Sequence, residues 1–588
     1  MARKQAKKCP DHPPDPFENL LRSGLARQNE GDFSGAHKIY RQVLAANPNH
    51  ADALHLDGLV ALKAGQLGAA ADLIRRAIII KPKEALFYMN LGNVLRHQGE
   101  GVAALSYYEQ SCRLAPENPG GFFNRATLLQ DMGRMEEALA DLETAAGLDS
   151  SHGDVGVAKA EVLISLGRGD EAIAVYETVL ANAPEHLAAR IGLAESLERL
   201  SRLEAAMGHV ERALALAPDH PRLVCLWAII RRRQGEPESA LERLTTVKTE
   251  GLIPPQARMV HAELGRLYDR LEQPEQAFKH FTAQNSTVRQ SLAGMPVNKA
   301  VYLDRVTALR AMFNTDAPLD WPALSDPEPW GAYPPVFLVG FPRSGTTLLD
   351  QVLDSHRDIR VLEERPVLIP VRDALESLPG GYPGSLVTLT AEMRDELRQQ
   401  YRSGLAKELD VSEEHVAAQP VINKLPLNII HAGLVHRVFP EARFILALRH
   451  PCDTVLSCFM QDFAVNNAMV NFLDLADSVH LYDEVMSLWK SYRVHFPLAV
   501  HEVKYEALVS DFDTEVTATL DFLGVEFDSA VRDFAGHARQ RTIRTPSYQQ
   551  VSEDLYGRAV FRWKRYQGKI DPYMETLNPY INHFGYDG

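Results

Sequence analysis

The sequence predicts an all-α superhelical repeat array followed by an α/β domain with a mostly parallel sheet. The first half of the 588-residue chain repeats itself every 34 residues, and a fixed period of that length is typical of stacked helix pairs. A dense group of prolines then interrupts the repeat, and beyond it short apolar segments alternate with helical ones, as in βαβ proteins. A chain of this length also exceeds what one hydrophobic core usually supports, so at least two domains are expected.

Small residues define the 34-residue period. A glycine or alanine precedes each of seven alanines by twelve residues, and a proline closes most units. Two antiparallel helices need small side chains where they cross closely, and proline ends the second helix because its ring cannot continue the hydrogen-bond ladder. An eighth unit follows a three-residue slip and keeps the twelve-residue interval between Gly265 and Ala277. The seven alanines are Ala36, Ala70, Ala104, Ala138, Ala172, Ala206 and Ala240.

The repeat pattern resembles that of tetratricopeptide repeats (TPRs). We expect residues 17–286 to form a right-handed TPR superhelix of about eight repeats, and the resemblance implies a concave face that binds a peptide or a partner protein. Residues 287–335 are expected to form a helical and proline-rich linker, with a helix over 287–313 that packs against the end of the superhelix. Six prolines within 318–335 suit an extended connector. The second domain is then expected to cover residues 336–588.

Three segments of the second domain are predicted to contain buried strands that lead into helices. They are VFLVG at 336–340, FILALRH at 444–450 and AVHEVKYEALV at 499–509. Strands that alternate with helices imply a mostly parallel sheet, and ligands then bind at the carboxyl ends of the strands.

The turn after the first of these strands has the form of a phosphate-binding loop, so the domain is predicted to be P-loop-like. Residues 340–347 read Gly-Phe-Pro-Arg-Ser-Gly-Thr-Thr. Glycines let backbone N–H groups point inward, and the following helix N-terminus favours an anion. Thr346 stands where a nucleotide triphosphatase has lysine, and Arg343 supplies the positive charge from within the loop. A guanidinium group can hold phosphate oxygens bidentately.

Residues 342–347, followed by an acidic pair, resemble the sulfotransferases that use 3′-phosphoadenosine 5′-phosphosulfate (PAPS), and most of all the tyrosylprotein sulfotransferase branch and its TPR-bearing bacterial relatives. The resemblance covers roughly residues 335–570 and implies a sulfotransferase fold, PAPS as co-substrate and no metal. By this resemblance the 5′-phosphosulfate is held by the phosphate loop, that is, by Arg343, Ser344, Gly345, Thr346 and Thr347. The 3′-phosphate is assigned to Arg449 and Ser457, which follow the second strand. Tyr505 would contact the adenosine, and Arg562 would belong to a segment that closes over the nucleotide.

Sulfuryl transfer needs a base for the acceptor proton and a cation for the leaving oxygen. Glu363 and Glu364 are adjacent in DIRVLEERP, and two carboxylates in a basic pocket can raise one pKa towards neutrality. The resemblance implies Glu364 as the base, with Glu363 left open as the alternative. It implies Lys424, in INKLPLN, as the cation. Arg343 and Ser547 complete the expected catalytic set.

The leading hypothesis is a PAPS-dependent O-sulfotransferase with protein or peptide tyrosine as the preferred acceptor, presented by the TPRs. A saccharide or a small-molecule alcohol is the alternative acceptor, because Arg365 directly follows Glu364 where the family has its arginine two residues past the base. A nucleotide phosphotransferase would need lysine at position 346 and a magnesium-binding aspartate after a strand. A catalytically silent nucleotide-binding TPR scaffold would have lost Glu364 or Lys424, and both are present.

The composition limits the partners that we expect. A net charge of −15 argues against nucleic-acid binding, whose electrostatic footprint is basic. The five cysteines show no metal-ligand spacing and fit a reducing compartment. The basic N-terminus is followed by no apolar h-region, and no apolar run reaches the length of a bilayer span. A cytoplasmic protein with no membrane partner is therefore expected, and the oligomeric state is left open.

Overall fold

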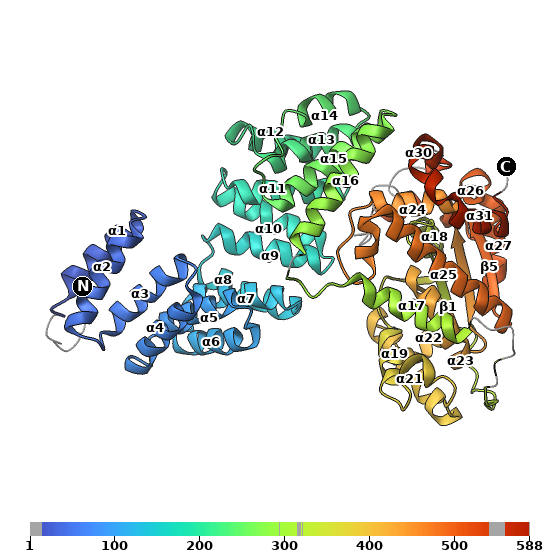
Figure 1. Cartoon of the computed structure of the whole chain (residues 1–588), viewed down its shortest axis with the longest axis horizontal. Coiled ribbons are helices and arrows are strands. Elements are labelled where there is room, and N and C mark those ends of the chain that lie inside the picture. The colour runs from blue at the N-terminus through green and yellow to red at the C-terminus, as the bar shows by residue number, and fades with distance from the viewer. Residues whose placement is uncertain (1–14, 293, 314–318, 320, 540–558, 587–588) are drawn as a thin grey trace, which may run out of the picture. The chain divides into compact units, whose positions relative to one another are not determined.

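A computed structural model of the chain describes residues 15–586 apart from 293, 314–318, 320 and 540–558. The chain forms two compact units, Met1–Ser196 and Leu197–Gly588. The first unit consists of helices that pack in consecutive pairs (Figure 1). Its helices are α1 (Glu18–Asn29), α2 (Phe33–Ala46), α3 (Ala51–Lys63), α4 (Leu67–Ile80), α5 (Ala85–His97), α6 (Gly101–Leu114), α7 (Pro119–Asp131), α8 (Met135–Leu148), α9 (Gly153–Ser165) and α10 (Gly169–Asn182), with α11 (Leu187–Arg199) across the division.

The small residues of the 34-residue period lie where the helices of a pair touch. A Cβ atom added to Gly58 would come within 2.7 Å of Ile74, and one added to Gly92 within 2.6 Å of Tyr108. Real Cβ atoms do not approach other atoms so closely, so a larger residue at either position would require the facing side chain to shift. The predicted helical repeat array is confirmed, and the close contacts at these two glycines agree with the small residues of its period.

The second unit begins with further helix pairs and continues into the α/β domain. Its first helices are α12 (Leu203–Leu216), α13 (Pro221–Arg233), α14 (Pro237–Leu244), α15 (Pro254–Arg270), α16 (Pro274–Ser291) and α17 (Lys299–Phe313). We expected a helix over 287–313 at the end of the superhelix; α17 instead packs along α25 (Leu475–His495) of the α/β domain. The ring of Phe313 meets that of Tyr492 at 4.8 Å, and Arg310 pairs with Glu484 at 2.5 Å. The apolar face of α17 thus completes the core of the domain.

A five-stranded parallel sheet forms the centre of the α/β domain, as the sequence predicted. The strand order is β2-β3-β1-β4-β5, and every described pair is parallel. Alternate residues of β1 belong to two hydrophobic cores, with Phe337 in one and Leu338 in the other, so both faces are covered. The strands are β1 (Val336–Gly340), β2 (Arg360–Glu363), β3 (Val421–Lys424), β4 (Arg443–Leu448) and β5 (Ala499–Lys504).

Helices and short 3-10 turns connect the strands and cover the sheet (Figure 1). Among the described helices, none combines the length and the apolar character that crossing a membrane requires. Besides α25, the domain contains α18 (Thr346–Asp354), α19 (Ile369–Glu376), α20 (Gly381–Gly384), α21 (Ala391–Leu409), α22 (Glu413–Ala418), η1 (Pro426–His431), α23 (Ala432–Val438), α24 (Pro451–Met460), η2 (Met469–Leu473), α26 (Tyr505–Ser510), α27 (Phe512–Leu523), η3 (Ser529–Asp533), α28 (Phe534–Arg539), η5 (Arg562–Tyr566), α30 (Gln567–Ile570), η6 (Asp571–Tyr573) and α31 (Met574–His583).

Candidate active site

The strand order defines where a ligand can bind. β1 lies between β3 and β4, and the chain leaves β1 towards one edge of the sheet and β4 towards the other. In such sheets the crevice for a ligand opens at the carboxyl ends of the two central strands. The phosphate loop follows β1, and Arg449 follows β4 directly, so both predicted anion-binding elements lie at this crevice.

Two glycines shape the phosphate loop. A Cβ atom at Gly340 would lie 2.6 Å from the carbonyl oxygen of Ala447 on β4, so only glycine fits there. Gly345 has a φ of +99°, and a Cβ atom on it would lie 3.0 Å from Tyr505. Arg343 also has a positive φ, of 69°, although it is not glycine. Backbone strain of this kind, on the order of 1–3 kcal/mol, is typical of functional loops.

Residues from three separated segments meet beside the loop. The Nε of Arg343 donates to Oγ of Ser457 on α24 at 3.1 Å. The guanidinium group of Arg449 lies over the ring of Tyr505 at 5.1 Å, and its Nη1 is 3.5 Å from the carbonyl oxygen of Arg343. A chain of contacts therefore links four of the residues implied to hold the donor, although they lie far apart in the sequence.

Buried donors in this group fit an anionic ligand. Oγ of Ser344 and Nε of Arg449 are both buried and have no hydrogen-bond partner within the described part of the chain. A buried polar group without a partner costs about 1–3 kcal/mol, so a site that keeps such groups is expected to receive one from a ligand. Thr346 and Thr347, both buried, begin α18 at the same loop. The residues present thus match the chemistry of a phosphate or sulfate group.

A cluster of three carboxylates surrounds one ammonium group next to the loop. Nζ of Lys424, at the end of β3, lies 2.8 Å from Oδ2 of Asp350, 3.0 Å from Oε1 of Glu364 and 3.6 Å from Oε1 of Glu363. Asp350 comes from α18, one turn after the phosphate loop. Lys424 is fully buried, so the cluster ties the ends of β2 and β3 to the helix that follows the loop.

The charges within this cluster shift the pKa of its members. Burial alone lowers the pKa of Lys424, but Asp350, Glu364 and Glu363 outweigh burial and leave the pKa above that of an ordinary lysine. Burial raises the pKa of Asp350 to about 7, against the lowering by Lys424. Three carboxylates around one ammonium group carry excess negative charge, so the most buried carboxyl group holds a proton most easily.

The two adjacent glutamates differ in geometry. The side chain of Glu364 is 37% exposed and that of Glu363 is 14% exposed. Glu364 has a φ of 49°, and its N–H donates to the carbonyl oxygen of Lys424 at 2.8 Å. This left-handed turn at the end of β2 directs the chain away from the sheet. Glu364 is consequently the more accessible carboxylate beside the ammonium group.

Comparison with known proteins agrees with this architecture. Residues 334–529 match a family model described as the sulfotransferase family. Residues 21–85, 58–119 and 157–221 match one tetratricopeptide repeat model, and residues 120–152 match another. This chain joins tetratricopeptide repeats to a sulfotransferase domain.

Three relatives illustrate the likeness. An uncharacterized protein of Aquifex aeolicus (strain VF5) is 28% identical over 253 residues, 41% of this chain and 32% of its own length. The protein-tyrosine sulfotransferase of Drosophila melanogaster is 25% identical over 272 residues, 43% of this chain and 52% of its own length. Protein-tyrosine sulfotransferase 1 of Danio rerio is 25% identical over 292 residues, 48% of this chain and 79% of its own length. The chain thus spans about a third and about half of the first two relatives.

Two further residues predicted for the sulfotransferase site lie outside the contacts described above. Arg562, on η5, contacts Asp269 of α15 through Nη1 at 3.4 Å. Ser547 lies outside the described residues. Their assignments to the donor and to catalysis stay predictions.

Sequence reasoning missed two buried acids of the sulfotransferase domain, Asp350 and Asp453, and gave no role to the half-buried Glu506. Asp350 is the nearest counterion of Lys424. Asp453, on α24, accepts from the N–H of Trp563 at 2.7 Å, and Glu506 accepts from the N–H of His450 at 2.9 Å. A signal was present for Asp350, which is the only acid among the apolar residues of TLLDQVL. A charge in a buried helix stretch indicates a partner.

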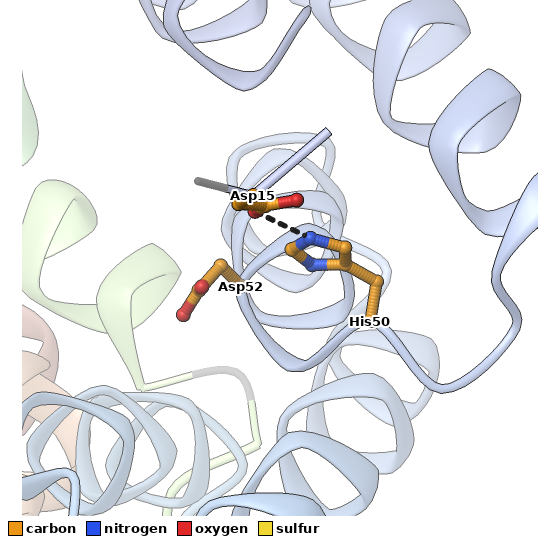
Figure 2. A group of neighbouring side chains, drawn as sticks. All are labelled: Asp15, His50 and Asp52. Carbon is orange, nitrogen blue, oxygen red and sulfur yellow. Dashed lines mark hydrogen bonds and ion pairs between the residues drawn. The ribbon is translucent and has the colours of Figure 1, made fainter. Parts of the chain in front are cut away.

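One cluster outside the sulfotransferase domain has side chains that could ligate a metal. Asp15, His50 and Asp52 lie together in the first unit (Figure 2). Nδ1 of His50 accepts from the N–H of Ala53 at 3.3 Å, so Nε2 carries the proton and donates to Asp15 at 2.8 Å. Asp52 pairs with Lys81 at 2.8 Å. These contacts cap α3 and join neighbouring repeats, so they account for the cluster structurally.

Proposed function

We propose that this protein transfers a sulfuryl group from PAPS to an acceptor hydroxyl, with tyrosine of a protein or peptide as the acceptor. The observation that carries the proposal is the pairing of Lys424 with Glu364 at 3.0 Å. The buried ammonium group of Lys424 and the accessible carboxylate of Glu364 lie next to each other at the carboxyl edge of the sheet, beside α18, the helix that follows the phosphate loop. This combination suits in-line transfer from an anionic donor to a hydroxyl group.

Each residue has a distinct task in this reaction. Glu364 accepts the hydroxyl proton while the acceptor oxygen forms a bond to sulfur. The bond from sulfur to the bridging oxygen of PAPS breaks, and that oxygen stays on the product 3′-phosphoadenosine 5′-phosphate (PAP). Lys424 and Arg343 stabilise the charge on the leaving oxygen and on the transferred group. Because a carboxylate and an ammonium group supply both functions, the proposal needs no metal.

Donor binding is assigned to the contact group beside the loop. Arg343, Ser344 and the first turn of α18 would hold the 5′-phosphosulfate. Arg449 and Ser457 would hold the 3′-phosphate, and Tyr505 would face the adenosine. The orphaned donors of Ser344 and Arg449 support this assignment, because a dianionic ligand would give them partners.

Two observations support tyrosine of a protein or peptide as the acceptor. The relatives from Drosophila and Danio are named protein-tyrosine sulfotransferases, and tetratricopeptide repeats commonly bind peptides and proteins. An accessible Glu364 can reach a phenol presented on a peptide.

The first test is calorimetric titration of PAP without magnesium into the wild type, Arg449→Ala and Arg360→Ala. Arg360 is exposed at the amino end of β2, so its variant is a matched control for removing one arginine. We expect tight binding by the wild type and the control, and a loss of about 100-fold or more in Arg449→Ala, because a charge-assisted bidentate contact is lost. A folded wild type that binds ATP and not PAP would refute the proposal.

The acceptor is tested separately with labelled PAPS. Peptides that contain tyrosine, the same peptides with phenylalanine or serine in its place, and desulfated saccharides are compared in one assay. Label that appears only on the tyrosine peptides supports the proposed acceptor. Label on a saccharide would refute the tyrosine acceptor while leaving sulfuryl transfer intact.

A further inference from the structure

The last repeat helices contact the segment that carries Arg562. Asp269, in the final turn of α15, accepts from Oη of Tyr566 at 2.7 Å, from Nη2 of Arg565 at 3.3 Å and from Nη1 of Arg562 at 3.4 Å. Nη1 of Arg565 also donates to the backbone carbonyl of Asp269 at 2.9 Å. Cations are favoured at the C-terminal end of a helix, where carbonyl groups lack helical partners. One aspartate of the repeat array therefore holds three side chains of η5.

The same segment also contacts the residues assigned to the donor. The N–H of Trp563 donates to Asp453 of α24 at 2.7 Å, and the ring of Trp563 stacks on that of His450 at 5.1 Å. Arg449 contacts the carbonyl oxygen of Ala559. The same helix, α24, carries Ser457, the partner of Arg343. The segment from 559 to 566 consequently lies between the repeat helix α15 and the residues assigned to the 3′-phosphate.

The contact between Asp269 and η5 pairs a negative charge with a positively charged segment. η5 contains four cationic or polar donors, Arg562, Lys564, Arg565 and Tyr566, and Asp269 is only 17% exposed. Partly buried charges are stable only when they are paired. A second ion pair, from Lys569 to Glu275 of α16 at 2.8 Å, joins the same surfaces, but Glu275 is 78% exposed. Asp269 is thus the more buried of the two acids, whereas Glu275 is exposed, and exposed ion pairs contribute little to stability.

We propose that Asp269 is a positioning residue for the donor site: it fixes Arg562 and the η5 segment against Arg449 and α24, which carry the groups assigned to the 3′-phosphate. This inference rests on the proposed function. The last helix pair, α15 and α16, then contributes to donor binding. A ligand that moves α15 would change the affinity of the protein for PAPS. By thermodynamic reciprocity, donor binding in turn stabilises α15 and α16.

The test compares PAP binding by the full-length wild type, Asp269→Asn and Glu275→Gln. Asp269→Asn keeps the shape and removes the charge, while Glu275→Gln removes the exposed ion pair of the same interface. We expect the Kd for PAP to rise about tenfold in Asp269→Asn and to change by less than about twofold in Glu275→Gln. The KM for PAPS should rise while kcat at saturating PAPS is kept. An unchanged or lower Kd in Asp269→Asn, or an equal rise in both variants, would overturn the inference.

A double-mutant cycle separates positioning from a general loss of structure. If Asp269 acts through Arg562, Asp269→Asn should have no further effect on PAP affinity in an Arg562→Ala background. Additive losses would show that Asp269 only supports the fold and would overturn the inference. Hydrogen exchange gives an independent readout, since PAP should protect the amides of α15 in the wild type and not in Asp269→Asn. A wild type that fails to bind PAP refutes the proposed function itself, whereas equal binding by wild type and Asp269→Asn refutes only the positioning role.

Discussion

Nζ of Lys424 lies 2.8 Å from Oδ2 of Asp350, and both side chains are buried. Asp350 comes from the helix after the phosphate loop, and Lys424 ends the neighbouring strand β3. The ion pair therefore fixes the proposed catalytic cation relative to the proposed donor site. Because Asp350 is inaccessible, it holds the ammonium group in place while the exposed side of the cluster is left to Glu364.

Removing the cation should affect folding and catalysis in separable ways. Lys424→Met leaves the buried Asp350 without its counterion, and breaking a buried pair costs about 3–5 kcal/mol. We expect a lower Tm and a loss of sulfuryl transfer of about 100-fold or more. The double variant Lys424→Met with Asp350→Asn should regain much of the stability, because the uncompensated charge is gone. It should not regain kcat. Recovery of activity in the double variant would contradict the role of Lys424.

Glu364 and Glu363 provide a matched pair for the base. Glu364→Gln should lower kcat by about 100- to 10,000-fold, the usual contribution of a general base, with the Kd for PAP little changed. Glu363→Gln should keep most of the activity because its side chain is less accessible. Transfer of label from PAPS to a tyrosine peptide measures kcat, and titration of PAP measures affinity. If Glu363→Gln is the inactive variant, the base is Glu363.

The buried carboxyl group of Asp350 should make stability depend on pH. Its folded pKa of about 7, raised chiefly by burial, lies above the ordinary value of 3.8. A raised folded pKa means that the native state binds this proton more tightly, so its contribution is complete below about pH 4 and is lost as pH rises through about 7. The free energy of unfolding of the wild type should fall relative to that of Asp350→Asn across this window. Denaturant unfolding at several pH values measures it, and a constant difference would contradict the shift.

The arrangement of the phosphate loop could be predicted from sequence because its determinants are local. Gly340, Gly345 and Arg343 lie within one strand-turn-helix unit, and the carboxyl ends of parallel strands meet at one edge. That rule also predicts that Arg449 and Lys424, which end or follow strands, lie near the loop. The helical repeats were predictable for a similar reason, since each 34-residue unit packs mainly on its neighbours.

Other features depend on contacts that no local pattern encodes. Arg562 contacts Asp269, which lies 293 residues away in the sequence. The 34-residue period does not indicate which helix of the repeats contacts the α/β domain. The packing of α17 on α25 is a comparable case, because an amphipathic helix shows that it has a buried face without showing which partner covers it. The role of Asp350 also depends on a fold-level contact, with β3.

A side chain at Gly345 should destabilise the phosphate loop, and a glycine within a helix offers the control. Gly345→Ala places a Cβ atom 3.0 Å from Tyr505 at a φ of +99°, so both the left-handed backbone and the contact oppose it. We expect a loss of stability of about 1–3 kcal/mol and weaker PAP binding, because the loop and Tyr505 must separate. Gly208, in α12 of the same unit, has open space around its Cβ position. Gly208→Ala should therefore raise the free energy of unfolding by about 0.5–1 kcal/mol, since alanine favours a helix, and should leave PAP binding unchanged. Equal PAP affinity in the two variants would show that the left-handed turn at Gly345 is not needed to bind the donor.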